Sequence, residues 1–332
     1  APQSSAADTE SHSGGFSPLG MSYFFWTSLI LLLATVGYRA LQRALRLDRF
    51  KGHFQALYPP SETVTWLQRA GQRPLRALIY KPPNWQATDR RPCVVLFFGG
   101  AWRVGSVWQF APFADRLRAQ GAVVILPEYR IKSRDRSTVL EAMEDGFALM
   151  DQISQSADCL GVDLARVCVG GGSAGGHLAA WIATGAHPNG PQTPQALKPA
   201  ALLLLNPAVN FPIDQAAFQG YSQQQKFSTR GLAKLSALDP MPHIEPGHPD
   251  TLILHGDHDQ LVPVDKVKGY AAALQHQNVT VTLKIYPGRA HAFFNQTVSS
   301  DDFESSCATL IDFLAERSLL GSAAVIRPSE TF

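Results

Sequence analysis

Short apolar runs alternate along the chain with segments of helical periodicity. The runs typical of strands with one or both faces buried are Leu75–Tyr80, Cys93–Phe98, Ala122–Leu126, Val167–Val169, Ala201–Leu205, Leu252–Leu254 and Val279–Tyr286. Between them, the spacing of apolar residues predicts helices at Trp108–Gln120, Ser137–Ser156, Ala174–Thr184, Val264–Gln277 and Phe303–Glu316, with Ser137 as an N-cap. This alternation predicts an α/β fold, with a mostly parallel sheet covered by helices on both faces.

The first 54 residues follow a different pattern. Residues 1–20 are rich in Ser, Gly, Ala and Pro, which predicts a disordered tail, and they lack an initiating methionine, so Met21 is a candidate natural start. An uncharged apolar run, Tyr23–Tyr38, is followed over 39–54 by apolar and basic residues at helical spacing. We therefore expect a tail over 1–20, a hydrophobic and amphipathic helical segment over 21–54, and one folded domain over 55–332.

The Tyr23–Tyr38 run is a candidate membrane anchor. As a helix it spans about 24 Å, short of a hydrocarbon core of about 30 Å, and Leu41 and Leu45 could extend it. Basic residues follow the run but do not precede it, which favours an anchor with the folded domain on the cytoplasmic side. The alternatives are a cleaved signal, giving a secreted or periplasmic protein, and a helix packed on the domain.

Composition narrows the classes of partner. The 332 residues are 45% hydrophobic and 17% charged, and a net charge of +2 gives no reason to expect a nucleic-acid partner. No metal-ligand spacing relates the four cysteines, and two of them lie in apolar runs, which indicates buried free thiols rather than a zinc site or a disulfide framework: Cys93, Cys159, Cys168 and Cys307. Oligomeric state is not decided by the sequence.

A cluster of glycines surrounds one serine after the Val167–Val169 run. The segment Gly171-Gly172-Ser173-Ala174-Gly175 matches G-x-S-x-G between a strand and a helix, which is the context of a nucleophile elbow. A serine at the tip of so tight a turn has a strained backbone, and the residues two before and two after it lie too close to other atoms for side chains. The motif is common by itself, so its meaning depends on its partners.

A serine hydroxyl needs a base to take its proton and a carboxylate to orient that base. With this elbow, the acid and then the histidine should follow at the carboxyl ends of later strands. Two strands lead into segments that contain Asp259 and His291. We therefore predict Ser173 as nucleophile, Asp259 as orienting acid and His291 as general base.

Each of these assignments has competitors. Asp257 could be the acid, although a Gly-Asp turn at the strand end explains it sufficiently. Among the histidines, His177 is expected to be a packed helix residue and His187 a solvated loop residue. His255 and His258 are nearer in sequence to the acid than a bridging base should be.

The remaining requirement is an oxyanion hole of backbone N–H donors. Phe98-Gly99-Gly100-Ala101-Trp102 follows a buried strand at the place where a glycine-rich loop supplies such donors. We predict the N–H groups of Gly100, Ala101 and Ala174 as the hole.

Together these segments resemble the α/β-hydrolase superfamily, and within it the hormone-sensitive-lipase-like and acetyl/feruloyl-esterase-like branch of carboxylesterases. The motifs that carry the resemblance are Phe97–Trp102, Gly171–Gly176, His255–Asp259 and Gly288–Phe293. The resemblance covers roughly residues 63–319 and implies an α/β-hydrolase fold and ester hydrolysis through an acyl-enzyme, with no metal or organic cofactor. One departure is Phe98, because the family usually has a histidine there; this puts in doubt how the loop is held.

Substrate size is predicted less directly. No long apolar helical insertion lies between Asn206 and Thr251, which favours short acyl esters, either small molecules or acetyl groups on polysaccharides. Candidate pocket walls are Phe98, Trp102, Trp108 and Phe294. The expected function is a serine carboxylesterase. The alternatives are an amidase, formamidase or peptidase with the same triad, and an inactive, membrane-tethered binding module.

Overall fold

The structure is a computed structural model and describes residues 52–187, 197–211 and 236–320. Residue contacts divide the chain into two units, Ala1–His53 and Phe54–Phe332, and nearly all described residues belong to the second. The predicted tail, the Tyr23–Tyr38 run and much of the segment between Asn206 and Thr251 lie outside the described residues. In the ranges that are described, no helix is both long enough and apolar enough to cross a membrane.

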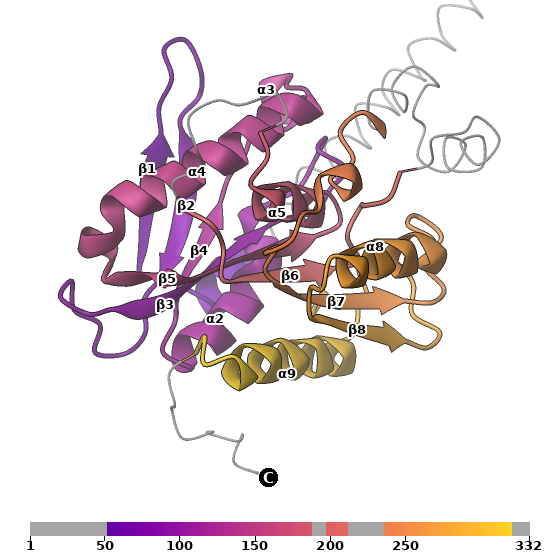
Figure 1. The fold of residues 1–332 in the computed structure, drawn as a ribbon. Coiled ribbons are helices and arrows are strands. Elements are labelled where there is room, and N and C mark those ends of the chain that lie inside the picture. Colours follow the sequence, from indigo (N-terminus) through magenta and orange to yellow (C-terminus); the bar gives the residue numbers. More distant parts are fainter. Residues whose placement is uncertain (1–51, 188–196, 212–235, 321–332) are drawn as a thin grey trace, which may run out of the picture. The chain divides into compact units, whose positions relative to one another are not determined.

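A twisted eight-stranded sheet runs through the described domain (Figure 1). Its order is β1-β2-β4-β3-β5-β6-β7-β8, and β1, β2 and β4 pair antiparallel while all other neighbours are parallel. The strands are β1 (Glu62–Leu67), β2 (Leu75–Tyr80), β3 (Arg91–Phe97), β4 (Val123–Pro127), β5 (Val162–Gly172), β6 (Ala201–Leu205), β7 (Asp250–Gly256) and β8 (Val281–Tyr286). The predicted mostly parallel α/β sheet is confirmed.

Helices cover the two faces of the sheet. In Figure 1, α4, α5 and α8 lie on one face and α2 and α9 on the other. The α-helices are α2 (Ala111–Ala119), α3 (Lys132–Asp135), α4 (Val139–Leu160), α5 (Ala174–Thr184), α8 (Val264–His276) and α9 (Ser300–Glu316); η1 (Val107–Phe110) and η2 (Met241–His243) are 3₁₀ helices. The predicted Trp108–Gln120 helix is therefore two segments, because Pro112 in the first turn of α2 starts a new helix after the 3₁₀ turn.

Sequence patterning did not predict β1. This edge strand alternates between half-buried and exposed residues, with only Trp66 buried, so it lacks the apolar run that marks the inner strands. It pairs antiparallel with β2, from Glu62 opposite Ile79 to Leu67 opposite Leu75.

The N-cap of α4 corrects the prediction at Ser137. Thr138, not Ser137, caps the helix: its side chain accepts from the Glu141 backbone N–H, and the Glu141 carboxylate accepts from the Thr138 N–H at 2.8 Å. This reciprocal pair is a capping box, which satisfies two of the donors that helix ends leave open. The Ser137 hydroxyl is buried instead, with no hydrogen-bond partner among the described residues.

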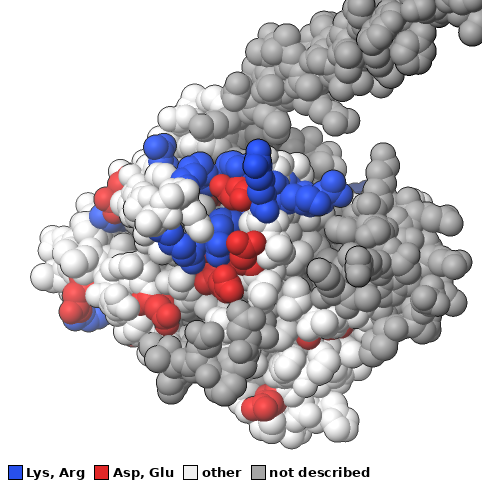
Figure 2. All heavy atoms as spheres, turned by 90° about the horizontal axis from the view of Figure 1, so that it is seen from above, with Lys and Arg blue, Asp and Glu red and all other residues white. Residues whose placement is uncertain are grey.

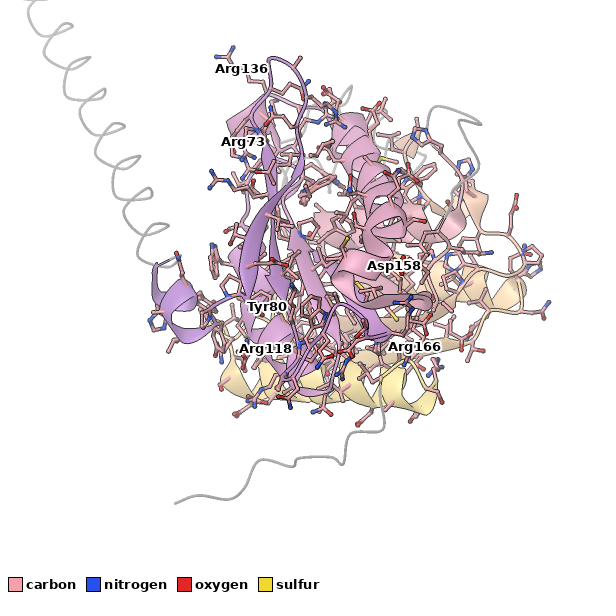
Figure 3. All side chains as sticks on the ribbon, turned by 90° about the vertical axis from the view of Figure 1, so that its left-hand side faces the viewer. Arg73, Tyr80, Arg118, Arg136, Asp158 and Arg166 are labelled. Carbon is pink, nitrogen blue, oxygen red and sulfur yellow. The ribbon has the colours of Figure 1, made fainter. Side chains whose placement is uncertain are left out.

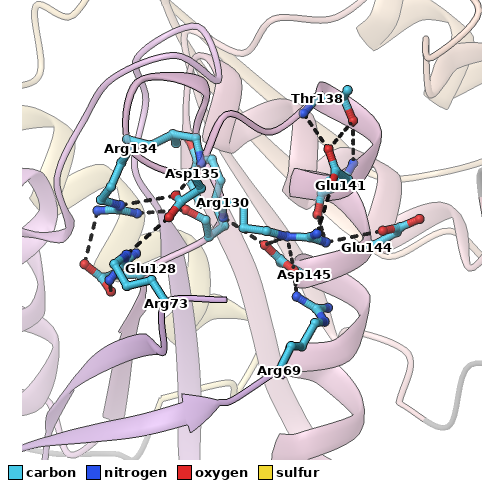
Figure 4. A network of polar contacts seen from close by, with 12 residues as sticks. Arg69, Arg73, Glu128, Arg130, Arg134, Asp135, Thr138, Glu141, Glu144 and Asp145 are labelled. Atoms are coloured by element: carbon cyan, nitrogen blue, oxygen red, sulfur yellow. Dashed lines mark hydrogen bonds and ion pairs between the residues drawn. The ribbon is translucent and has the colours of Figure 1, made fainter. Parts of the chain in front are cut away.

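A network of ion pairs ties α4 to the β1–β2 hairpin and the β4–α4 connection (Figure 4). At its centre Asp145 of α4 is fully buried and accepts from the Arg130 side chain at 3.0 Å and from Arg69 at 2.7 Å. Glu128 and Asp135 pair with further arginines beside it. On the face drawn in Figure 2, Lys and Arg side chains gather with Asp and Glu side chains between them. Removing one partner of such a buried pair typically costs about 3–5 kcal/mol, so the network fixes the connection.

Figure 3 shows Tyr80 and Arg118 beside one another near the outer strands of the sheet. The Arg118 guanidinium of α2 lies 5.8 Å from the centre of the Tyr80 ring. Burial, which is the largest effect, raises the pKa of the Tyr80 phenol, so it stays protonated as a donor to the Tyr58 carbonyl at 2.9 Å.

Two thiols lie where buried strands were predicted. Cys93 on β3 and Cys168 on β5 are fully buried and not bonded to each other. Burial raises the pKa of Cys168 to about 12, which keeps the thiol protonated and inert. The prediction of buried free thiols at these two positions is confirmed.

Candidate active site

Ser173 occupies a strained turn between β5 and α5. Its backbone angles are φ 52° and ψ −116°, a region that side-chain-bearing residues rarely adopt. A Cβ at either Gly171 or Gly175 would overlap the carbonyl oxygen of Phe97 on the neighbouring strand, which confirms the predicted need for glycine at both positions.

Backbone hydrogen bonds hold the turn in this conformation. The Ser173 N–H donates to the Leu205 carbonyl at 3.0 Å, at the end of β6. Its carbonyl accepts from His177 at 3.0 Å and from Ala208 at 3.1 Å. The turn is therefore fixed to both the following helix and the neighbouring strand, and the N-terminus of α5 begins at Ala174, directly after the hydroxyl.

Asp259 and His291 come together from the loops that follow β7 and β8. The imidazole Nδ1 of His291 lies 2.7 Å from Oδ2 of Asp259. Oδ1 of the same carboxylate accepts the backbone N–H groups of Leu261 and Val262, both at 2.9 Å. The carboxylate is nearly fully buried, whereas the imidazole keeps partial access to solvent.

The charge state of Asp259 follows from these contacts. Burial by itself would raise the pKa of the carboxyl group, but the hydrogen bond and charge of His291 and the N–H of Val262 outweigh burial and hold that pKa below its usual value. An ionised carboxylate on Nδ1 favours the tautomer in which Nε2 carries a free lone pair, which is the form that can take a proton from a serine.

The competing residues have other partners. Asp257 is exposed and accepts the backbone N–H of Gly288, in the turn after β8, at 2.6 Å. His258 is an exposed neighbour of Asp257, while His255 is buried with Nε2 2.9 Å from the Val262 carbonyl. Burial lowers the pKa of the His255 imidazole, which keeps that ring neutral.

His177 is a packed helix residue, as predicted. It is fully buried on α5, with Nε2 2.7 Å from the Leu238 carbonyl and its ring 5.0 Å from that of Trp102. Burial lowers the pKa of His177 to about 4.

The glycine-rich loop after β3 lies directly against Ser173. A Cβ at Gly99 would be 3.3 Å from Cβ of Ser173, so only glycine permits this approach. Gly100 has a φ of 132° and Ala101 a φ of 53°. Within the described ranges, the N–H groups of Gly100 and Ala101 donate to no backbone carbonyl of the turns and loops, and Ala174 is the first residue of α5. Their role as an oxyanion hole stays a prediction.

Tyr129 holds this loop at Phe98. Its ring stacks on Phe98 at 4.2 Å between ring centres, and its hydroxyl donates to the Phe98 carbonyl at 2.7 Å. Burial, the largest effect, raises the pKa of Tyr129 well above its ordinary value, so the hydroxyl remains a donor at any physiological pH. Tyr129 lies after a buried strand, which is a signal that could have pointed to it.

A series of side-chain hydrogen bonds joins the glycine-rich loop after β3 to the loop that carries His291. The Gly99 N–H donates to the Gln109 side chain at 2.7 Å, and Gln109 donates to Asn295 at 3.0 Å. The Asn295 amide in turn donates to the Ala292 carbonyl, next to His291. Sequence reasoning did not single out these residues or Asn206, which contacts His291; Asn206 directly follows β6, and polar residues at strand ends were the available signal.

The four candidate pocket walls are all buried against other side chains. Trp102 contacts His177 and Phe211, Phe98 stacks on Tyr129, and Trp108 is only 4% exposed. Phe294 belongs to a ring cluster with Phe110, and a Cβ at Gly172 would reach both rings, so this cluster lies directly behind the elbow. Contact of these residues with substrate stays a prediction. No group of three or more potential metal ligands is found within the described part of the chain.

The chain is similar in sequence to proteins named as ester hydrolases. A probable carboxylic ester hydrolase, LipM of Mycobacterium tuberculosis, is 26% identical over 231 residues, which are 65% of this chain and 52% of the relative. An isoprenylcysteine alpha-carbonyl methylesterase of Arabidopsis thaliana is 23% identical over 77% of this chain and 64% of its own length. The chain thus spans less than two thirds of the length of these relatives.

Among solved structures, a thermophilic esterase from Thermogutta terrifontis with bound butyrate superposes with a TM-score of 0.70 and 28% identity. That match covers 80% of this chain and 97% of the esterase. Residues 94–295 match the sequence pattern of a family described as the alpha/beta hydrolase fold. On fold, elbow and sequence pattern together, the chain belongs to the alpha/beta hydrolase fold family.

Proposed function

We propose that the protein is a serine carboxylesterase that hydrolyses short-chain acyl esters through an acyl-enzyme. The observation that carries this proposal is the Asp259–His291 hydrogen bond of 2.7 Å at the same sheet edge as the strained Ser173 turn. Relatives named as carboxylic ester hydrolases support the reaction class.

The reaction would proceed in two halves. In the first, Oγ of Ser173 attacks the ester carbonyl carbon while Nε2 of His291 takes the hydroxyl proton. The N–H groups of Gly100, Ala101 and Ala174 receive the carbonyl oxygen as it becomes negative, and His291 then gives its proton to the leaving alcohol. In the second half, water replaces the alcohol, His291 activates it, and the acid product and free Ser173 are released.

A short acyl group is the proposed preference. Supporting it are the sequence between Asn206 and Thr251, which has no long apolar helical insertion, and structures of the Thermogutta terrifontis esterase with butyrate and propionate bound. Acetyl esters of small molecules or polysaccharides are among these short-chain substrates.

The deciding experiment is a series of p-nitrophenyl esters of increasing acyl length, with the matching anilides, measured on wild type and on Ser173→Ala. We expect the highest kcat/KM at two to four acyl carbons, with Ser173→Ala losing both turnover and fluorophosphonate labelling. A maximum beyond ten carbons would contradict the short-chain proposal. Faster turnover of anilides than of esters would point instead to an amidase.

Attachment to a membrane through residues 23–38 remains a sequence-based proposal. It predicts that the full-length chain needs detergent to stay in solution, whereas a chain beginning near Phe54 does not. Equal behaviour of the two chains without detergent would argue against the anchor.

A further inference from the structure

Asn206 follows β6 and reaches the histidine loop with its side chain. It is fully buried and has a φ of 39°, a left-handed conformation that asparagine tolerates better than most residues. Its backbone N–H donates to the Leu254 carbonyl of β7 at 2.8 Å. Its Oδ1 accepts the backbone N–H of Ala292 at 2.9 Å, and its Nδ2 lies 3.4 Å from Nε2 of His291.

The contact with Ala292 decides which end of the amide faces the imidazole. A backbone N–H can only donate, so Oδ1 must be the atom beside Ala292, and Nδ2 is left for His291. Nδ2 carries two hydrogens and no available lone pair. The contact is therefore favourable when Nε2 is an unprotonated acceptor, and unfavourable when Nε2 itself carries a proton.

The other groups around the imidazole either favour its protonated form or have their own partners. Asp259, on Nδ1, favours the protonated ring through its negative charge. Among the described residues, His255 is a further titratable group near the ring; burial lowers its pKa, and its Nε2 lies 3.6 Å from the shared Asp259 carboxylate. Arg289, on the histidine loop, pairs with Asp302 at 2.7 Å instead.

We propose that Asn206 is a positioning residue. Its amide group keeps Nε2 of His291 unprotonated and able to accept a proton, and its carbonyl oxygen fixes the loop that carries this histidine. This rests on the proposed esterase mechanism. At 3.4 Å the amide contact is weak, so it yields when the Ser173 hydroxyl presents its proton. In that step the Ser173 O–H bond breaks, an Nε2–H bond forms, and the oxygen is left as the nucleophile. The Gln109–Asn295 bridge holds the same loop through the Ala292 carbonyl.

Asn206→Asp tests the electrostatic part. The replacement has almost the same shape, still accepts from Ala292 and tolerates the left-handed backbone, but it places a negative oxygen against Nε2. A negative neighbour favours the protonated imidazole, so a higher pH is needed to free the base. We expect the acidic midpoint of the kcat/KM profile to rise by about one pH unit or more, and kcat at neutral pH to fall with little change in KM.

Asn206→Gly tests the same role without adding charge. Glycine keeps the left-handed backbone and removes both side-chain contacts, so we expect a lower kcat and a smaller upward shift of the midpoint. The matched control is Asn278→Asp, an exposed asparagine with a φ of 60°, which should leave the midpoint unchanged.

Titration of ¹⁵N-labelled His291 by NMR, in the same full-length variants, separates this proposal from the proposed function. If the titration midpoint of His291 moves in Asn206→Asp but wild type hydrolyses no ester, the positioning role stands and the esterase proposal falls. If wild type hydrolyses esters but neither variant moves the midpoint, and both lose only thermal stability, Asn206 is a structural residue and the proposal is overturned.

Discussion

At the scale of single residues, the two oxygens of Asp259 have separate tasks. Oδ1 accepts two backbone N–H groups of its own loop, and Oδ2 accepts Nδ1–H of His291. The loop therefore holds the carboxylate rigidly before any substrate binds. An orienting group that is fixed in this way does not have to be reorganised during each turnover.

Asp259→Asn should keep this shape and lose the function of Oδ2. The new amide N–H would face Nδ1 and favour the wrong tautomer of His291, so we expect kcat to fall by about 10⁴-fold with little change in KM. Steady-state kinetics with a p-nitrophenyl ester measure this. Asp257→Asn, on the exposed side of the same loop, is the matched control, and an equal loss there would argue that Asp259 is not the orienting acid.

At the scale of elements, the loop after β3 depends on Tyr129, which follows β4. Tyr129→Phe keeps the stack on Phe98 and removes the hydroxyl, which leaves a buried carbonyl without its donor. We expect the free energy of unfolding to fall by about 1–3 kcal/mol and kcat to fall with it. Denaturant unfolding and kinetics check both effects.

Tyr58→Phe is the control for that variant, because it removes a tyrosine hydroxyl bonded to Gln296 at 2.9 Å. If kcat falls equally in both variants, the phenol of Tyr129 has no particular role in the oxyanion loop.

The start of α4 offers a second element-scale prediction. Thr138→Ala breaks the capping box and should lower the free energy of unfolding by about 1 kcal/mol. Ser137→Ala removes a buried hydroxyl that has no partner within the described residues and should be neutral or stabilising. Urea unfolding of the pair decides between them, and a larger loss for Ser137→Ala would restore Ser137 as the cap.

The same elements show what the sequence could predict. Inner strands and helices were placed from apolar runs, and the order acid then histidine led to Asp259 and His291, which do form the expected hydrogen bond. β1 was missed because an edge strand buries too few residues to leave an apolar run. Asn206 and Gln109 were missed because their contacts join residues far apart in sequence, which no local pattern encodes.

At the scale of the whole molecule, buried histidines make stability depend on pH. Burial lowers the pKa values of His177 and His248 to about 4 in the folded protein, against an ordinary value of about 6.5. Between those values the unfolded chain binds more protons than the folded one. The contribution of these two imidazoles to the free energy of unfolding is therefore fully present above pH 6.5 and is lost as the pH is lowered toward 4.

For His177 alone, the loss between neutral pH and pH 5 should be about 2 kcal/mol. His177→Gln should reduce this pH dependence, whatever its effect at pH 7, while His258→Gln, which changes an exposed imidazole, should not. Urea unfolding at both pH values measures the difference. An unchanged dependence in His177→Gln would show that other groups cause the acid destabilisation.

The pairing of Phe98 with Tyr129 also constrains how this chain can diverge. A histidine at 98 would bring a polar ring into a stack of two apolar faces, while a smaller residue at 129 would leave the Phe98 carbonyl without its donor. Each exchange alone should therefore lower the free energy of unfolding, and the two losses should not simply add, because both act on the same stack and the same carbonyl.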